Sequence, residues 1–87
     1  MQVAVEISYY PLLADYEPPI IAFIEGLKTH PGLTVATNQL STQVSGDYDE
    51  VMSAIQSEIK KSLQNGPKAS FVLKVLNVDI EPGQVIM

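Results

Sequence analysis

A single carboxylate lies in the middle of the first alternating stretch of the chain. Glu6 is flanked by Val5 and Ile7 within residues 2–10, where side chains of two kinds alternate. This period of two is typical of a β-strand. Charged side chains rarely lie inside a strand without a partner, so we expect Glu6 to pair with a cation or to accept a hydrogen bond from an amine. The alternative is a solvated carboxylate on an open sheet face.

Hydroxyl and amide side chains that could complete a binding site with Glu6 gather in the first strand and in the middle of the chain. The candidate ligand-binding residues, besides Glu6, are Ser8, Tyr10, Thr37, Asn38, Ser41, Thr42 and Tyr48. Such groups supply hydrogen bonds to a polar ligand, and the Tyr48 ring could close over it. Taken singly, each is better explained by structure: Asn38 suits a turn, and Tyr48 suits packing at the base of a helix.

No pattern in the sequence predicts catalysis or a metal site. His30 has no His or Cys partner with which to hold a metal, and it is expected at the surface, at the end of a helix. Asp47 and Glu50 lie in the first turn of a predicted helix, where they are expected to form a capping box. The chain contains neither cysteine nor arginine. We therefore predict a protein that is not an enzyme and uses no cofactor.

Length and charge limit the classes of protein further. The 87 residues are enough for one domain, expected over residues 1–87. The net charge of −5 argues against a nucleic-acid partner and is compatible with a cationic small ligand. Neither a signal-peptide pattern nor an apolar run of about 18 residues is present, so we expect no signal peptide and no membrane partner.

The periodicity predicts four strands and two helices. The strands are expected at residues 2–10, 33–37, 40–45 and 68–80. One helix is expected to begin at Pro18 and Pro19 and to stop at residues 30–32. The other is expected to begin after an Asp47 cap and to end at residues 65–67, with Gly46 breaking the strand before it. Residues 84–87 could add a further edge strand.

This order, βαββαβ, is that of a ferredoxin-like fold of the α+β class: one four-stranded antiparallel sheet with two helices on one face. Val3, Val5, Ile7 and Tyr9 are expected to face the helices. Leu40 is expected to share a face with Thr42 and Val44, opposite Ser41, Gln43 and Ser45. The last strand, being almost continuously apolar, is expected to be covered on both faces. The other sheet face is mixed in polarity, which indicates a surface for assembly and ligand binding.

Four segments resemble the YkoF-type family that binds thiamine or hydroxymethylpyrimidine. They are EISYYPL (Glu6 to Leu12), PPIIAFIEGLK (18–28), TNQLSTQVSGDYDEVM (Thr37 to Met52) and KASFVLKVLN (68–77). The resemblance implies a ferredoxin-like domain in the cytoplasm. The best-known members carry two such domains in tandem, whereas this chain has one, which implies a homodimer or homotetramer.

The resemblance implies binding of thiamine, or of its hydroxymethylpyrimidine moiety, by a carrier, buffer or sensor. Thiamine is a cation that carries an aminopyrimidine, so it requires a carboxylate, hydrogen-bond partners and an apolar or aromatic wall. The candidate residues are of these types. The alternative function is that of an oligomeric assembly or regulatory module, similar to ACT domains, with no small ligand of its own.

Overall fold

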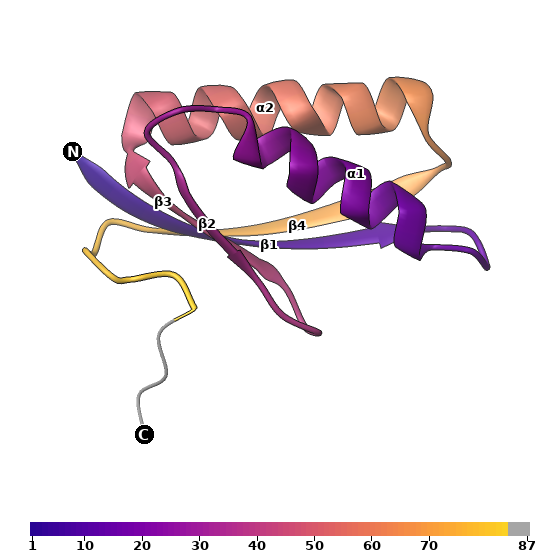
Figure 1. The fold of residues 1–87 in the computed structure, drawn as a ribbon, viewed down its shortest axis with the longest axis horizontal. Coiled ribbons are helices and arrows are strands. Elements are labelled where there is room, and N and C mark those ends of the chain that lie inside the picture. The colour runs from indigo at the N-terminus through magenta and orange to yellow at the C-terminus, as the bar shows by residue number, and fades with distance from the viewer. Residues whose placement is uncertain (84–87) are drawn as a thin grey trace.

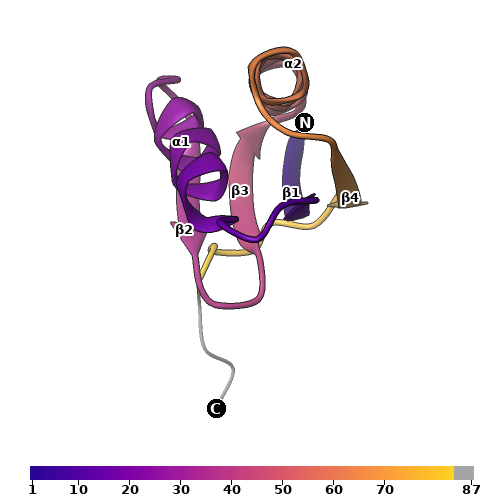
Figure 2. The same ribbon diagram turned by 90° about the vertical axis from the view of Figure 1, so that its right-hand side faces the viewer.

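The computed structural model describes residues 1–83, and its elements follow the order βαββαβ. The strands are β1 (Gln2–Pro11), β2 (Thr34–Thr37), β3 (Thr42–Asp47) and β4 (Ala69–Leu76), and the helices are α1 (Glu17–Lys28) and α2 (Tyr48–Asn65). The strands form a four-stranded antiparallel sheet in the order β2-β3-β1-β4. Both helices lie on the same side of it (Figures 1 and 2). The predicted ferredoxin-like α+β fold is confirmed.

The core lies between the helices and one face of the sheet. Alternate residues of β1 reach this layer, and Tyr9 packs at its edge, as the alternation predicted. Each helix contributes a stripe of apolar residues at helical spacing. The buried core residues are Val3, Val5, Ile7, Phe23, Leu27, Val44, Val51 and Ile55. The two central strands, β1 and β3, thus carry most of the buried sheet residues.

The start of α2 confirms the Asp47 cap and corrects the predicted capping box. The Asp47 side chain accepts a hydrogen bond from the Asp49 backbone N–H at 3.2 Å. The Glu50 carboxylate instead lies beside Gly32. If Gly32 carried a Cβ, that atom would be 2.9 Å from Glu50 Oε2. Gly46 does not end its strand: it stays within β3 at a φ of 155°, where a Cβ would lie 2.9 Å from the Gly32 carbonyl oxygen.

The hairpin and the last strand differ from their predicted bounds. Asn38 Oδ1 accepts hydrogen bonds from the backbone N–H of Leu40 at 2.8 Å and of Ser41 at 3.1 Å. This local network makes the turn longer than two residues, so β3 begins at Thr42. Leu40 was predicted to share a face with Thr42 and Val44, but it is 89% exposed whereas those two residues are buried. The prediction that the last strand is covered on both faces is wrong: β4 is an edge strand that pairs with β1, and Val72 and Val75 are exposed.

The segment after β4 turns back under the sheet, on the side away from the helices (Figures 1 and 2). The Gly83 backbone N–H donates a hydrogen bond to Gln43 Oε1 on β3 at 2.7 Å, which fixes the end of this segment. The edge strand predicted for residues 84–87 lies outside the described residues. Neither helix in residues 1–83 has both the length and the apolar character needed to cross a membrane.

Candidate functional site

Glu6 occupies the centre of the sheet face opposite the helices. Its Cα partners are Gln43 on β3 and Lys74 on β4, so three long polar side chains form a row across the sheet. In an antiparallel sheet, residues in register project to the same face, which places all three on the open side. The open face predicted for Glu6 is therefore observed, with Val5 and Ile7 buried on the opposite face.

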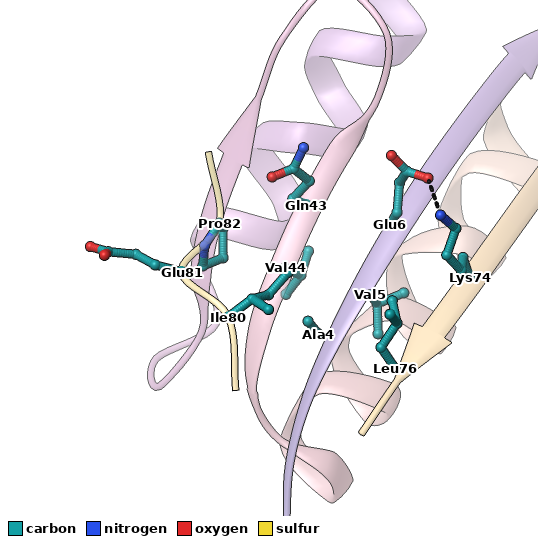
Figure 3. Close-up of a pocket in the computed structure, with 10 residues that line it drawn as sticks. All are labelled: Ala4, Val5, Glu6, Gln43, Val44, Lys74, Leu76, Ile80, Glu81 and Pro82. Atoms are coloured by element: carbon teal, nitrogen blue, oxygen red, sulfur yellow. Dashed lines mark ion pairs between the residues drawn. The ribbon is translucent and has the colours of Figure 1, made fainter. Parts of the chain in front are cut away.

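The Glu6 carboxylate has two partners, one on each side. Ser41 Oγ donates a hydrogen bond to Glu6 Oε2 at 3.0 Å. On the other side, Lys74 Nζ lies 3.7 Å from Glu6 Oε1, and Figure 3 shows this ion pair. The Glu6 side chain is 42% exposed and that of Lys74 is 67% exposed. An ion pair this long and this exposed contributes little to stability. Glu6 therefore presents a charge that an incoming cation or amine can reach.

A cavity of about 550 Å³ lies beside Glu6 on the open face, between the sheet and the returning C-terminal segment. In Figure 3, Ile80 and Pro82 lie on one side of the cavity, and Glu6 and Lys74 lie on the opposite side. Ala4 is only 3% exposed although it faces away from the helices. The residues lining the cavity are Ala4, Val5, Glu6, Gln43, Val44, Lys74, Leu76, Ile80, Glu81 and Pro82. The site is thus mostly apolar with charged groups at its ends.

Sequence reasoning missed Gln43 and Lys74 as neighbours of Glu6. Lys74 interrupts an apolar strand just as Glu6 does, and this shared feature could have suggested that the two pair. The register that brings them together is fixed by the pairing of β1 (Gln2–Pro11) with β4 (Ala69–Leu76), two strands far apart in the sequence with no short turn to set it. Ile80 was predicted to be the end of the last strand, but β4 ends at Leu76, so Ile80 and Pro82 lie in the irregular segment that follows it.

Five of the candidate residues gather around a second, smaller hollow at the β2–β3 turn. This hollow has a volume of about 230 Å³, and the five are Tyr10, Thr37, Asn38, Ser41 and Thr42. Thr42 is buried, and its Oγ1 lies 3.1 Å from Thr37 Oγ1, so these two hydroxyls hold the hairpin together. The Asn38 side-chain oxygen already accepts two hydrogen bonds from the turn backbone. Ser41 connects the hollow to the cavity through its hydrogen bond to Glu6.

The remaining candidates are dispersed. Ser8 lies half-buried opposite Val72, on the same face as Glu6. Tyr48 is the first residue of α2, beyond the far end of β3 from Ser41. Six strand residues separate the two, or roughly 20 Å at the usual rise per residue. The structure therefore does not bring Tyr48 together with the other candidate residues.

His30 has a partner that the sequence did not predict. Its Nε2 lies 2.8 Å from Glu58 Oε2 of α2, and Lys61 Nζ lies 3.1 Å from the same oxygen. Burial raises the pKa of Glu58, but the hydrogen bonds from His30 and Lys61, with the charges of both, outweigh it and hold that pKa below its ordinary value. The His30–Glu58 contact links the segment after α1 to α2, on the opposite side of the sheet from Glu6.

The fold and the site together define a ferredoxin-like α+β protein with a polar row and an apolar cavity on its open sheet face. The chain belongs to the YkoF-related family, which matches it over residues 2–75. No curated protein matches the chain at a significant level.

Several solved structures share the fold. The hypothetical protein MJ1052 from Methanocaldococcus jannascii is 26% identical, with a TM-score of 0.78 over 97% of this chain and 88% of the other. TM0486 from Thermotoga maritima, a candidate thiamine biosynthesis/salvage protein, is 21% identical with a TM-score of 0.76, covering 86% and 82%. SP2199 from Streptococcus pneumoniae is 20% identical with a TM-score of 0.81, covering 92% and 90%.

Proposed function

We propose that the protein binds thiamine or its hydroxymethylpyrimidine moiety without catalysing a reaction, and that it acts as a carrier, buffer or sensor. The observation that carries this proposal is the Glu6 carboxylate at one end of an apolar cavity of about 550 Å³ on the open sheet face. Membership of the YkoF-related family and the thiamine-related name of TM0486 support the choice of ligand.

The chemistry of thiamine suits this cavity. Its thiazolium ring is cationic, and its pyrimidine carries an amine that needs an acceptor, so either end of the molecule can meet the Glu6 carboxylate. The ring faces require an apolar wall, which Leu76 and Ile80 offer. Lys74 competes for Glu6, but its long contact and exposed side chain leave it free to swing into solvent. The volume lies within the range of small-molecule sites, whereas the hollow of about 230 Å³ at the β2–β3 turn is too small.

Replacing Glu6 by Gln tests the site. The variant keeps the shape and removes the charge, and we expect thiamine affinity to fall about tenfold to a hundredfold, because a hydrogen bond to a charged group contributes about 1.5–3 kcal/mol. Isothermal titration calorimetry on wild type and variant measures this. Glu25→Gln is the matched control, since Glu25 is an exposed carboxylate on α1. Equal affinity in all three proteins would remove Glu6 from the site.

The second candidate function is an assembly module similar to ACT domains. The exposed edge strand β4 favours it, because such a strand pairs readily with another chain. A thermal-shift screen with thiamine, its phosphates and hydroxymethylpyrimidine separates the two functions. Stabilisation by any of these compounds supports the binding protein. An oligomer that responds to none of them supports the assembly module.

We further propose a homodimer or homotetramer located in the cytoplasm, with no nucleic-acid partner. The acidic charge of −5 disfavours contact with a phosphate backbone. The exposed apolar residues of β4 and the partly open sheet face give a second copy surfaces on which to pack.

A further inference from the structure

A separate cavity lies between the two helices, on the other side of the sheet from Glu6. Its volume is about 430 Å³, and it is bounded by α1, by the last turns of α2 and by the end of β1. Figure 2 shows the two helices side by side above the sheet. The lining residues are Tyr9, Pro18, Pro19, Ala22, Phe23, Glu58, Lys61, Ser62, Asn65, Gly66 and Pro67. None of these belongs to the cavity beside Glu6.

The Tyr9 hydroxyl is the group in this cavity that requires a partner. It is buried, and no other group in residues 1–83 forms a hydrogen bond with it. The Tyr9 ring is held firmly: it stacks on Phe71 with centroids 4.2 Å apart and meets Phe23 edge-on at 5.5 Å. Packing therefore fixes the position of the hydroxyl. A buried polar group without a partner is costly, so a hydrogen-bond acceptor placed here gains more than it would at the surface.

The charges around the cavity select a neutral ligand. The buried Glu58 carboxylate repels an anion, and the first turn of α1 offers fewer backbone donors because Pro18 and Pro19 have no N–H. Lys61 repels a cation, and its ammonium already compensates Glu58 at 3.1 Å. The apolar walls are Phe23, Ala22 and the prolines, which suit a flat ring.

We propose that this interhelical cavity binds a neutral, planar ring compound whose carbonyl or ring-nitrogen acceptor takes the hydrogen bond of the Tyr9 hydroxyl. Amide donors on such a ligand can reach Ser62 or Asn65, which line the same cavity. The site is independent of the proposed thiamine site, because the two cavities share no residue and lie on opposite faces of the sheet.

Benzamide, benzoate and benzamidine form a matched series of one shape and three charges with which to test the site. Each is titrated at millimolar concentration into ¹⁵N-labelled protein, and amide shifts are followed by NMR. We expect benzamide to shift residues that line the cavity and the two charged compounds to leave them unchanged. Tyr9→Phe removes the hydroxyl and keeps the ring, so benzamide affinity should fall about three- to tenfold, with the melting temperature unchanged or raised.

A steric variant keeps the test decisive if Tyr9→Phe does not fold. Ala22 is exposed on α1 and lines the cavity, so Ala22→Leu should fill it and abolish benzamide binding. Ser57→Leu, on the exposed face of α2 and outside the cavity, is the control and should bind as wild type does. The proposal is overturned if benzoate or benzamidine binds this cavity as tightly as benzamide, or if neither Tyr9→Phe nor Ala22→Leu weakens binding.

Discussion

At the scale of single residues, the chain contains two carboxylates with opposite surroundings. Glu6 is half-exposed and lies 3.7 Å from its lysine, whereas Glu58 is buried and bonded to two basic side chains within 3.1 Å. The charge of Glu6 is therefore accessible to a ligand. The charge of Glu58 is compensated by its neighbours and is suited to structural contacts. Breaking a buried pair costs far more than breaking an exposed one, because the remaining charge is left in an apolar environment.

Glu58 should make folding sensitive to acid. Because its pKa in the folded protein is below the ordinary value of 4.5, ionised Glu58 stabilises the fold above that pH, and this contribution is lost as pH falls through the folded pKa. Glu58→Gln should lower the free energy of unfolding at neutral pH by about 1–3 kcal/mol and make it less dependent on pH below 4.5. Urea unfolding across the acid range measures both effects.

The control for this prediction is Glu25→Gln, which neutralises an exposed carboxylate on α1. It should behave as wild type does at every pH. The Asp47 pKa is also lowered, chiefly by a hydrogen bond from the chain's N-terminal amine, so some acid sensitivity should persist in Glu58→Gln. Identical acid profiles for wild type and Glu58→Gln would show that the ion pair does not stabilise the fold.

At the scale of the elements, Gly26 of α1 packs against the Glu58 side chain of α2. A Cβ at Gly26 would collide with the Glu58 carboxylate. Glycine lowers helix stability by about 1 kcal/mol relative to alanine, so the residue is unfavourable for α1 alone. The contact between helices therefore explains why a glycine occupies this position in the last turn of α1.

A double-mutant cycle tests this interpretation. Gly26→Ala should destabilise the protein, because moving Glu58 disrupts its bonds to His30 and Lys61 by more than the gain in helix propensity. In a Glu58→Ala background the same change should be neutral or stabilising by up to about 1 kcal/mol. Chemical denaturation of the four proteins gives the coupling energy. A Gly26→Ala protein that is more stable than wild type would contradict the observed contact.

The sequence predicted elements well and long-range register poorly. Alternation in β1, the proline start of α1 and the Asp47 cap are local signals, and each agrees with the structure. The hairpin was misplaced because the hydrogen bonds of Asn38 depend on side-chain geometry that periodicity does not encode. The pairs Glu6–Lys74 and His30–Glu58 escaped prediction because each joins segments far apart in the chain.

At the scale of the whole molecule, the fold is a slab that measures 35 × 30 × 19 Å. Helices cover one sheet face, and the segment after β4 covers only part of the other (Figures 1 and 2). The edge strand β4 exposes Val72 and Val75 on opposite faces. Apolar side chains that stay exposed along an edge strand favour association with a further chain, and this supports the proposed homo-oligomer.

Size-exclusion chromatography with light scattering tests the assembly. At tens of micromolar, the wild type should elute well above the monomer mass of 9.5 kDa. Val72→Glu places a charge on the edge strand, and we expect it to shift the protein towards monomer, because burying an unpaired carboxylate in an interface is costly. Ser57→Glu makes the same charge change on the exposed face of α2 and should leave the oligomer intact. A wild-type protein that stays monomeric at this concentration would contradict the proposed assembly.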